Sequence, residues 1–271
     1  MLSRAPVRAG HIVLSGVEKT FVRGLRKTQA LNGVDFEIGE GEFVAVVGPS
    51  GCGKSTLLRL VSGLTAPSAG SVHVGGEEVD GPRKDTGIVF QKATLVDWRD
   101  ILGNVMLQLE LRGIEGPEHR ERARALLTAV GLGNFMDRYP RELSGGMQQR
   151  AAIARGLVHQ PTILLMDEPF GALDALTREQ MRLDLEGLWI RDRMTVFFIT
   201  HSIDEAVLLA DRVIVMTERP GTVDSVFEVD LPRPRGLAAR KDPRFADLVD
   251  KITQIFLTRG VLDEHRSSLA S

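Results

Sequence analysis

The stretch that decides the fold is residues 48–55, which read Gly-Pro-Ser-Gly-Cys-Gly-Lys-Ser. They match the pattern G-x-x-x-x-G-K-[ST], follow a nearly continuous apolar run at 42–47 and precede a helix-like run at 56–60. The glycines let the backbone curl so that successive N–H groups point at phosphate oxygens, and the following helix adds its positive N-terminal end. The stretch therefore predicts a phosphate-binding loop between a buried parallel strand and a helix, rather than a glycine-rich turn with a surface lysine.

This loop supplies most of the candidate nucleotide contacts. We expect Lys54 to reach the β- and γ-phosphates and the hydroxyl of Ser55 to coordinate Mg²⁺. Because Cys52 lies inside the loop, we also expect a thiol reagent to block the activity that depends on this loop and a bound nucleotide to protect it. The candidate contacts are Gly48, Pro49, Ser50, Gly51, Cys52, Gly53, Lys54, Ser55 and Thr56.

Hydrophobic periodicity around the loop predicts an α/β fold. Short apolar segments separated by turn residues fill residues 11–79 and predict strands, the first two and the last in an antiparallel arrangement. Three later apolar runs alternate with helix-like segments, as in a parallel sheet wrapped in helices. These runs are residues 162–166, 194–200 and 212–216.

Residues 92–157 differ from the rest because their periodicity is helical. Residues 118–130 stop at Gly131, and residues 144–158 start from a capping serine, Ser144. A short amphipathic helix is also expected at 245–256. We interpret residues 1–271 as one domain with three parts: a core with an antiparallel β part (11–91 and 158–231), an inserted helical subdomain (92–157), and a C-terminal tail (232–271) that offers at most a small dimer or regulatory contact.

Composition excludes several classes of protein. The 271 residues include 34 Lys and Arg against 36 Asp and Glu, so the formal net charge of −2 gives no global basic field for nucleic acid. One cysteine cannot form an internal disulfide and the N-terminus lacks the pattern of a signal peptide, so we expect a cytosolic chain. No run approaches the ~20 apolar residues of a membrane span. Any role at a membrane must therefore come through a partner.

Two carboxylates follow the apolar run that ends at Met166. Asp167 suits a metal ion, directly or through water, and Glu168 suits polarisation of an attacking water. Both stand at the carboxyl end of a predicted strand, where ligands bind in open α/β sheets. Acidic residues in such places also face solvent or cap helices, and it is the phosphate-binding loop that favours the catalytic interpretation.

A second phosphate-binding turn occurs at residues 143–150, Leu-Ser-Gly-Gly-Met-Gln-Gln-Arg, where Ser-Gly-Gly opens a helix. One nucleotide does not need two such turns from one chain. This stretch resembles the L-S-G-G-x-Q signature of the ATPase subunits of ABC transporters, and the resemblance extends over about residues 11–230. It implies a P-loop ATPase core of mostly parallel sheet, with an N-terminal antiparallel β-subdomain and an inserted helical subdomain. It also implies a head-to-tail dimer, with itself or a homologue, in which Ser144, Gly145 and Gly146 of one subunit contact the ATP held by the other.

The resemblance assigns roles to four further positions. Gln91 matches the glutamine that reaches Mg²⁺ and the attacking water, and Asp174 lies in the loop 172–174 that crosses the dimer interface. His201 matches the switch histidine, which hydrogen-bonds the γ-phosphate and positions the water. Phe21 stands where the family places an aromatic ring against adenine. The implied cofactors are ATP and Mg²⁺, with Ser55, Gln91 and Asp167 at the metal and Glu168, His201 and Gln91 in catalysis.

The resemblance implies partners as well. We expect transmembrane permease subunits to dock on residues 92–111, and a periplasmic or extracellular solute-binding protein to act through them. The chain is then a peripheral subunit at the cytoplasmic face of the inner membrane, with no nucleic-acid partner. Residues 95–99, 171–178 and 218–221 resemble the nitrate, sulfonate and taurine branch of importers, which usually has Pro where this chain has Asp97.

Two other classes of protein match parts of the sequence. A soluble ABC ATPase acting on nucleic acid or ribosomes normally has two cassettes or a long heptad insertion, whereas this chain shows one cassette and no heptads. A P-loop kinase or GTPase shares residues 48–55 but has no use for residues 143–150. The interpretation that uses both stretches is the ATP-hydrolysing motor of an importer for a small anionic solute such as nitrate, sulfonate or taurine.

Overall fold

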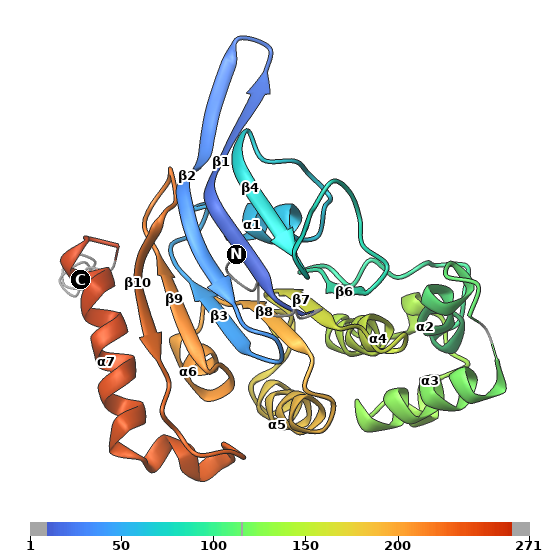
Figure 1. Ribbon diagram of the computed structural model, residues 1–271. Coiled ribbons are helices and arrows are strands. Elements are labelled where there is room, and N and C mark those ends of the chain that lie inside the picture. Colours follow the sequence, from blue (N-terminus) through green and yellow to red (C-terminus); the bar gives the residue numbers. More distant parts are fainter. Residues whose placement is uncertain (1–9, 115, 262–271) are drawn as a thin grey trace, which may run out of the picture.

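A computed structural model describes residues 10–114 and 116–261, which form two sheets with helices around them (Figure 1). The larger sheet has the strand order β10-β9-β3-β8-β7-β6 and is parallel except for β10, which runs antiparallel to β9. This arrangement confirms the predicted α/β fold. Its strands are β3 (Phe43–Val47), β6 (Thr86–Val89), β7 (Ile163–Asp167), β8 (Thr195–Ile199), β9 (Arg212–Met216) and β10 (Val223–Glu228).

Strand β3 is buried along its whole length and pairs in parallel with β8 and β9, as predicted for residues 42–47. Its alternate residues face two different cores. Phe43, Ala45 and Val47 join one cluster of buried side chains, and Val44 and Val46 join the other. Because both faces of the sheet are covered, the central strands are apolar at nearly every position.

The smaller sheet is antiparallel in the order β2-β1-β4-β5, which confirms the predicted pairing. Its strands are β1 (Ile12–Arg23), β2 (Arg26–Ile38), β4 (Ala69–Val74) and β5 (Glu77–Glu78). Strands β1 and β2 extend past the predicted apolar segments into a hairpin whose tip projects from the body (Figure 1). The outer half of this hairpin is exposed, so its sequence lacks the apolar alternation of a half-buried strand.

The helices form three groups: α1 alone, α2 to α4, and α5 to α7 (Figure 1). Helix α1 follows the phosphate-binding loop and contacts β4, β7 and β8, so it lies between the two sheets. Helices α2, α3 and α4 pack on one another, and α4 contacts β6. The helices are α1 (Lys54–Val61), α2 (Ile101–Glu110), α3 (Pro117–Ala129), α4 (Gly145–Leu157), α5 (Ala175–Asp192), α6 (Ile203–Leu209) and α7 (Pro243–Thr258), with 3₁₀ turns at Gly133–Phe135, Pro140–Glu142 and Leu237–Lys241.

The ends of the predicted helices follow local signals. Helix α3 stops before Gly131, whose φ of +71° is left-handed and suits glycine. Helix α4 begins after Ser144, whose side chain accepts a hydrogen bond from the backbone N–H of Met147 at 3.3 Å. Within residues 10–114 and 116–261, no helix has both the length and the apolar character that crossing a membrane requires.

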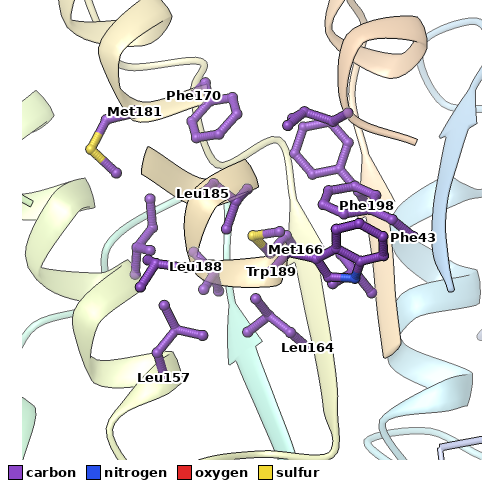
Figure 2. Close-up of a cluster of buried hydrophobic side chains, with 14 of the residues drawn as sticks. Phe43, Leu157, Leu164, Met166, Phe170, Met181, Leu185, Leu188, Trp189 and Phe198 are labelled. Atoms are coloured by element: carbon purple, nitrogen blue, oxygen red, sulfur yellow. The ribbon is translucent and has the colours of Figure 1, made fainter. Parts of the chain in front are cut away.

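One core lies where α5 packs on the larger sheet (Figure 2). Trp189 is 1% exposed, meets Phe43 edge to face with ring centroids 5.9 Å apart, and donates from Nε1 to the carbonyl oxygen of Met194 at 2.9 Å. Phe170 packs against Phe198 in the same core, with centroids 5.7 Å apart. Because Phe170 follows β7 by only a few residues, this packing anchors the loop that leaves the strand.

The C-terminal segment also belongs to the core. Helix α7 covers the predicted helix at 245–256 and buries Phe245 and Phe256, and it packs on α6. Arg235 is 2% exposed and donates to a terminal carbonyl of α6, that of Ala210, at 2.5 Å. This segment therefore completes the fold, which is more than the small dimer or regulatory contact expected from the sequence.

Strand β10 is not predicted by the hydrophobic pattern. It is an edge strand whose residues are half-buried or exposed, and prolines and arginines surround it in the sequence. Its pairing with β9 is a long-range contact that a local pattern does not indicate.

Replacement of Gly87 tests how tightly β6 and α4 pack. A Cβ at this position would lie 2.3 Å from the carbonyl oxygen of Gly156 on α4. We expect Gly87→Ala to lower the free energy of unfolding by about 1–3 kcal/mol, measured by urea denaturation. As a control, Gly187→Ala on α5, where an added Cβ meets nothing within 4 Å, should raise it by roughly 0.5–1 kcal/mol. Equal effects of the two substitutions would contradict this account of the packing.

Candidate functional site

The phosphate-binding loop connects β3 to α1, as predicted. Gly53 is the N-cap of α1 with φ of +110°. A Cβ at this position would lie 2.6 Å from Cδ2 of Leu31 and 2.9 Å from the carbonyl oxygen of Ala30. Both the left-handed backbone and the close approach of β2 therefore require glycine here.

Lys54 lies inside the loop and is only 5% exposed. Its Nζ donates to the carbonyl oxygens of Gly48 at 2.7 Å and Pro49 at 2.9 Å. These are neutral acceptors, and a phosphate oxygen is a stronger one for an ammonium group. The loop thus holds a buried cation whose present partners an anion can replace.

Ser55 and Asp167 face each other at the start of α1 and the end of β7. The hydroxyl of Ser55 donates to Oδ1 of Asp167 at 3.1 Å, and Asp167 is 9% exposed. Hydroxyl and carboxylate oxygens are ligands that Mg²⁺ prefers, especially together with phosphate oxygens. The donor set therefore suits a magnesium ion.

Glu168 is the point where three strand ends meet. Its Oε2 accepts a hydrogen bond from Nε2 of Gln91 at 3.0 Å, and its Oε1 lies 2.5 Å from Nε2 of His201. These residues follow β6, β7 and β8, whose carboxyl ends adjoin in the sheet. The backbone of Glu168 has φ of +48°, a left-handed conformation that costs on the order of 1–3 kcal/mol for a non-glycine residue. The strained backbone of Glu168 thus lies at the centre of the candidate site.

A cleft of about 340 Å³ lies along the loop and reaches Glu168 and His201. Phe21 lies on its wall, 41% exposed, with Nζ of Lys19 5.3 Å from its ring centroid. The lining residues are Phe21, Thr28, Ala30, Ser50, Gly51, Gly53, Lys54, Ser55, Thr56, Glu168, His201 and Arg219.

Three of these lining residues are not predicted from the sequence. Thr28 is the cross-strand partner of Phe21, and Ala30 follows it on β2. Arg219 comes shortly after β9, which pairs with β3. The signal for Arg219 is its position past the carboxyl end of a parallel strand, whereas Thr28 and Ala30 depend on a hairpin register that the sequence pattern does not reveal.

The signature residues and Asp174 do not line this cleft. Ser144, Gly145 and Gly146 form the start of α4, and Asp174 caps α5 by accepting a hydrogen bond from the backbone N–H of Thr177 at 3.0 Å. That hydrogen bond lowers the pKa of the Asp174 carboxyl. The structure thus brings the loop, Gln91, Asp167, Glu168 and His201 together and places the signature residues elsewhere.

Two buried side chains of α4 hold the segment around Gln91. Gln149 is 1% exposed and donates to the carbonyl oxygen of Phe90 at 2.9 Å. Arg155 is 8% exposed and donates to the carbonyl oxygens of Ala93 at 2.7 Å and Thr94 at 2.8 Å. The sequence pattern does not predict that these two side chains position the segment, because a polar residue on a helix usually faces solvent.

Residues 92–111 present an ordered loop and helix α2. Asn104 is fully buried, donates to the carbonyl oxygens of Val96 and Arg99, and accepts from the backbone N–H of Val96 at 2.6 Å. Within the loop that Asn104 organises, the side chain of Trp98 is 79% exposed. A large exposed aromatic residue on an ordered loop is a feature of protein contact sites.

The side chain of Cys52 points away from the cleft. It is 1% exposed and belongs to the core between the two sheets. Burial raises the pKa of its thiol, and the nearby charge of Lys54 only partly opposes this effect. We therefore expect a thiol reagent to block this loop only slowly in the folded chain, because a buried thiol of raised pKa is a poor nucleophile.

A family model and the sequence relatives of this chain point to the same family. The family model described as ABC transporter matches residues 31–171. The chain is 42% identical over 267 residues to the nitrate import ATP-binding protein NrtD of Synechocystis sp., covering 96% of this chain and 100% of the relative. It is 46% identical to the taurine import ATP-binding protein TauB of Rhizobium johnstonii over 235 residues, 85% and 90% of the two chains. It is 42% identical to the aliphatic sulfonates import ATP-binding protein SsuB of Bacillus licheniformis over 241 residues, 89% and 92%.

Solved structures agree with the sequence relatives. A dimeric bacterial ABC transporter cassette superposes with a TM-score of 0.74 at 36% identity, covering 82% of this chain and 100% of that chain. A post-hydrolysis state of a cassette bound to ADP and Pi gives a TM-score of 0.73 at 35% identity with the same coverage.

The position of Cys52 can be tested by alkylation. We expect iodoacetamide to modify the folded chain at least about tenfold more slowly than the urea-unfolded chain at the same pH, because burial limits access and raises the thiol pKa. Mass spectrometry of the single cysteine measures both rates. Equal rates in the two states would mean that the thiol is accessible in the folded loop.

Proposed function

The chain belongs to the ABC transporter family, whose ATP-binding subunits are ATPases, and from that premise we propose that it powers an importer for a small anionic solute such as nitrate, a sulfonate or taurine. The support for import is that relatives matched over most of their length carry the names of nitrate, taurine and sulfonate import proteins. These names favour an importer over a soluble ABC ATPase that acts on nucleic acid or ribosomes. The net charge of −2 points the same way.

The observation that carries the catalytic proposal is the position of Glu168 beside the loop, in contact with both Gln91 and His201. In this proposal the ATP phosphates lie on the loop, where Lys54 exchanges its carbonyl partners for phosphate oxygens. Glu168 polarises the attacking water, while Gln91 and His201 hold that water and the γ-phosphate. Phosphoryl transfer needs positioning and charge stabilisation more than covalent chemistry, and these side chains supply both.

Magnesium is part of the same proposal. Ser55 and Asp167 would hold the ion, with Gln91 as the third protein ligand, because all three offer oxygen atoms. When bound, the ion neutralises charge on the phosphate oxygens. Phe21 would stack on adenine from the wall of the cleft.

We propose a head-to-tail dimer as the hydrolytic form. Ser144, Gly145 and Gly146 do not reach the cleft of their own chain, although they open a helix whose N-terminal end suits phosphate. In the dimer Ser144 of the partner subunit approaches the γ-phosphate, and the loop containing Asp174 lies at the interface. The dimeric state of a similar cassette supports this assembly.

The permease contact is proposed on residues 92–111, within a helical subdomain of residues 92–157 inserted in the core. The exposed Trp98 and its neighbour Asp97 lie on the loop that Asn104 organises. Permease subunits bound there would hold the chain as a peripheral subunit at the cytoplasmic face of the membrane, with a solute-binding protein acting on the other side.

The catalytic assignment predicts the behaviour of Glu168→Gln. Loss of the carboxylate should lower hydrolysis by roughly 10²–10⁴-fold, while ATP still binds and is not consumed. Sedimentation velocity with ATP and Mg²⁺ should therefore show a dimer. Glu228→Gln, on the exposed edge strand β10, is the matched control and should hydrolyse ATP normally. A Glu168→Gln chain that stays monomeric while the wild type hydrolyses ATP would refute the dimer mechanism.

The docking assignment predicts the behaviour of Trp98→Ala. This variant should keep the basal ATPase activity of the isolated chain but lose most of its membrane association when co-expressed with its permease, because an exposed aromatic anchor is removed. Leu25→Ala, a fully exposed residue at the tip of the β1–β2 hairpin, is the control. Immunoblots of washed membranes measure both. Unchanged membrane association of Trp98→Ala would exclude Trp98 from the contact.

A further inference from the structure

A second cavity, of about 110 Å³, also touches Glu168 and His201. Thr200 and Ser202, which flank the histidine, contribute to its wall together with Arg178 of α5 and Glu205 of α6. None of these four residues lines the cleft along the phosphate-binding loop. The Glu168–His201 pair therefore has a second set of neighbours to which the proposed function assigns no role.

Glu205 is tied to the residues on both sides of His201. Its Oε2 accepts a hydrogen bond from the hydroxyl of Thr200 at 2.5 Å, and that hydroxyl accepts one from the backbone N–H of Ser202 at 3.0 Å. The hydroxyl of Ser202 in turn accepts from the backbone N–H of Glu205 at 3.2 Å, which caps α6. These bonds close a ring around the turn that carries His201. The orientation of that turn therefore depends on the position of the Glu205 side chain.

Arg178 joins this turn to the loop 172–174. Its Nη2 donates to the carbonyl oxygen of Leu173 at 3.0 Å, and its Nε lies 3.8 Å from Oε1 of Glu205. Within the described residues this buried Nε has no hydrogen-bond partner, so its contact with Glu205 is an ion pair longer than a hydrogen bond. Leu173 itself lies against the signature turn, since a Cβ on Gly146 would be 3.1 Å from its Cδ2. One chain of contacts thus runs from the signature turn to His201.

The positive charge of Arg178 stabilises the carboxylate of Glu205, so the contacts that Glu205 makes depend on Arg178. The Glu205 side chain is 12% exposed and that of Arg178 is 42% exposed. Burial raises the pKa of the Glu205 carboxyl, whereas the Thr200 hydrogen bond and the Arg178 charge act in the opposite direction. Without Arg178, this mostly buried carboxylate would lose the larger of the two positive charges that act on it, the other being Arg182, and its hold on the turn would change.

We propose that Arg178 and Glu205 are positioning residues that transmit the conformation of the loop 172–174 to His201 and thereby set the geometry of the Glu168–His201 pair. The inference rests on the proposed function, in which that loop meets the partner subunit. Docking of the second subunit then moves Leu173, and Arg178 and Glu205 carry the displacement to the turn around His201. Neither residue lines the cleft along the phosphate-binding loop, so their effect falls on the rate of hydrolysis and leaves nucleotide binding unchanged.

The test is a double-mutant cycle with Arg178→Met, Glu205→Gln and the double variant, assayed for kcat and KM of ATP hydrolysis. We expect each single variant to lower kcat roughly 3- to 30-fold, with KM within about twofold of wild type. The double variant should be no slower than the worse single variant, because both substitutions break one connection. Arg240→Met is the control, since its ion pair with Glu179 joins the 3₁₀ turn at Leu237–Lys241 to α5 and is not part of this chain of contacts, and it should leave kcat unchanged.

Two further measurements separate this inference from simpler explanations. Thermal denaturation should give the variants midpoints close to wild type, so that lost activity is not lost folding. In a Glu168→Gln background, Arg178→Met should still form the ATP-dependent dimer, which shows that transmission rather than assembly has failed. Unchanged kcat in both single variants, multiplicative effects in the double variant, or loss of the dimer would overturn the proposal. Failure of the Glu168→Gln parent itself to dimerise would instead refute the proposed function.

Discussion

The larger sheet is buried on both faces, and this constraint decides where polar chemistry can occur. In β3, β7 and β8 every residue is buried, so side chains that need water, a metal ion or a phosphate are confined almost entirely to the ends of the strands. Because these strands are parallel, their carboxyl ends share one edge. The phosphate-binding loop, Asp167 with Glu168, and His201 meet at that edge for this reason.

Burial also explains why loops around the site keep a defined shape. The loop after β6 is held by Gln149 and Arg155, and the loop after β7 is anchored in the core by Phe170. Each of these polar side chains donates to at least one backbone carbonyl of the loop, so its loss leaves that carbonyl without this partner. The segments after β6 and β7 are therefore tied to the body of the protein close to Gln91 and Glu168.

Sequence patterns predicted the parts of this molecule that are local. The loop at 48–55, the strand before it and the Ser144 cap depend on neighbouring residues, and all three lie where they were expected. The hairpin extension, β10, and the roles of Gln149 and Arg155 depend on contacts between residues far apart in the chain, which periodicity does not encode. Arg219 and the Arg178–Glu205 pair belong to the same group. Contacts between distant segments, more than the identity of single residues, therefore limited how much of the site could be predicted.

The buried Arg235 has a consequence for the order in which the chain matures during synthesis. Its guanidinium donates to the carbonyl oxygens of Val207, Ala210, Val229 and Leu231. Until the ribosome has released residue 235, the last turn of α6 has no such donors and its helix end is uncapped. The segment that begins beside His201 can therefore reach its final form only after most of the chain has emerged. Strand β3, which leads into the loop at 48–55, likewise gains both of its neighbours only when β8 and β9 have emerged, so the two halves of the site are completed together.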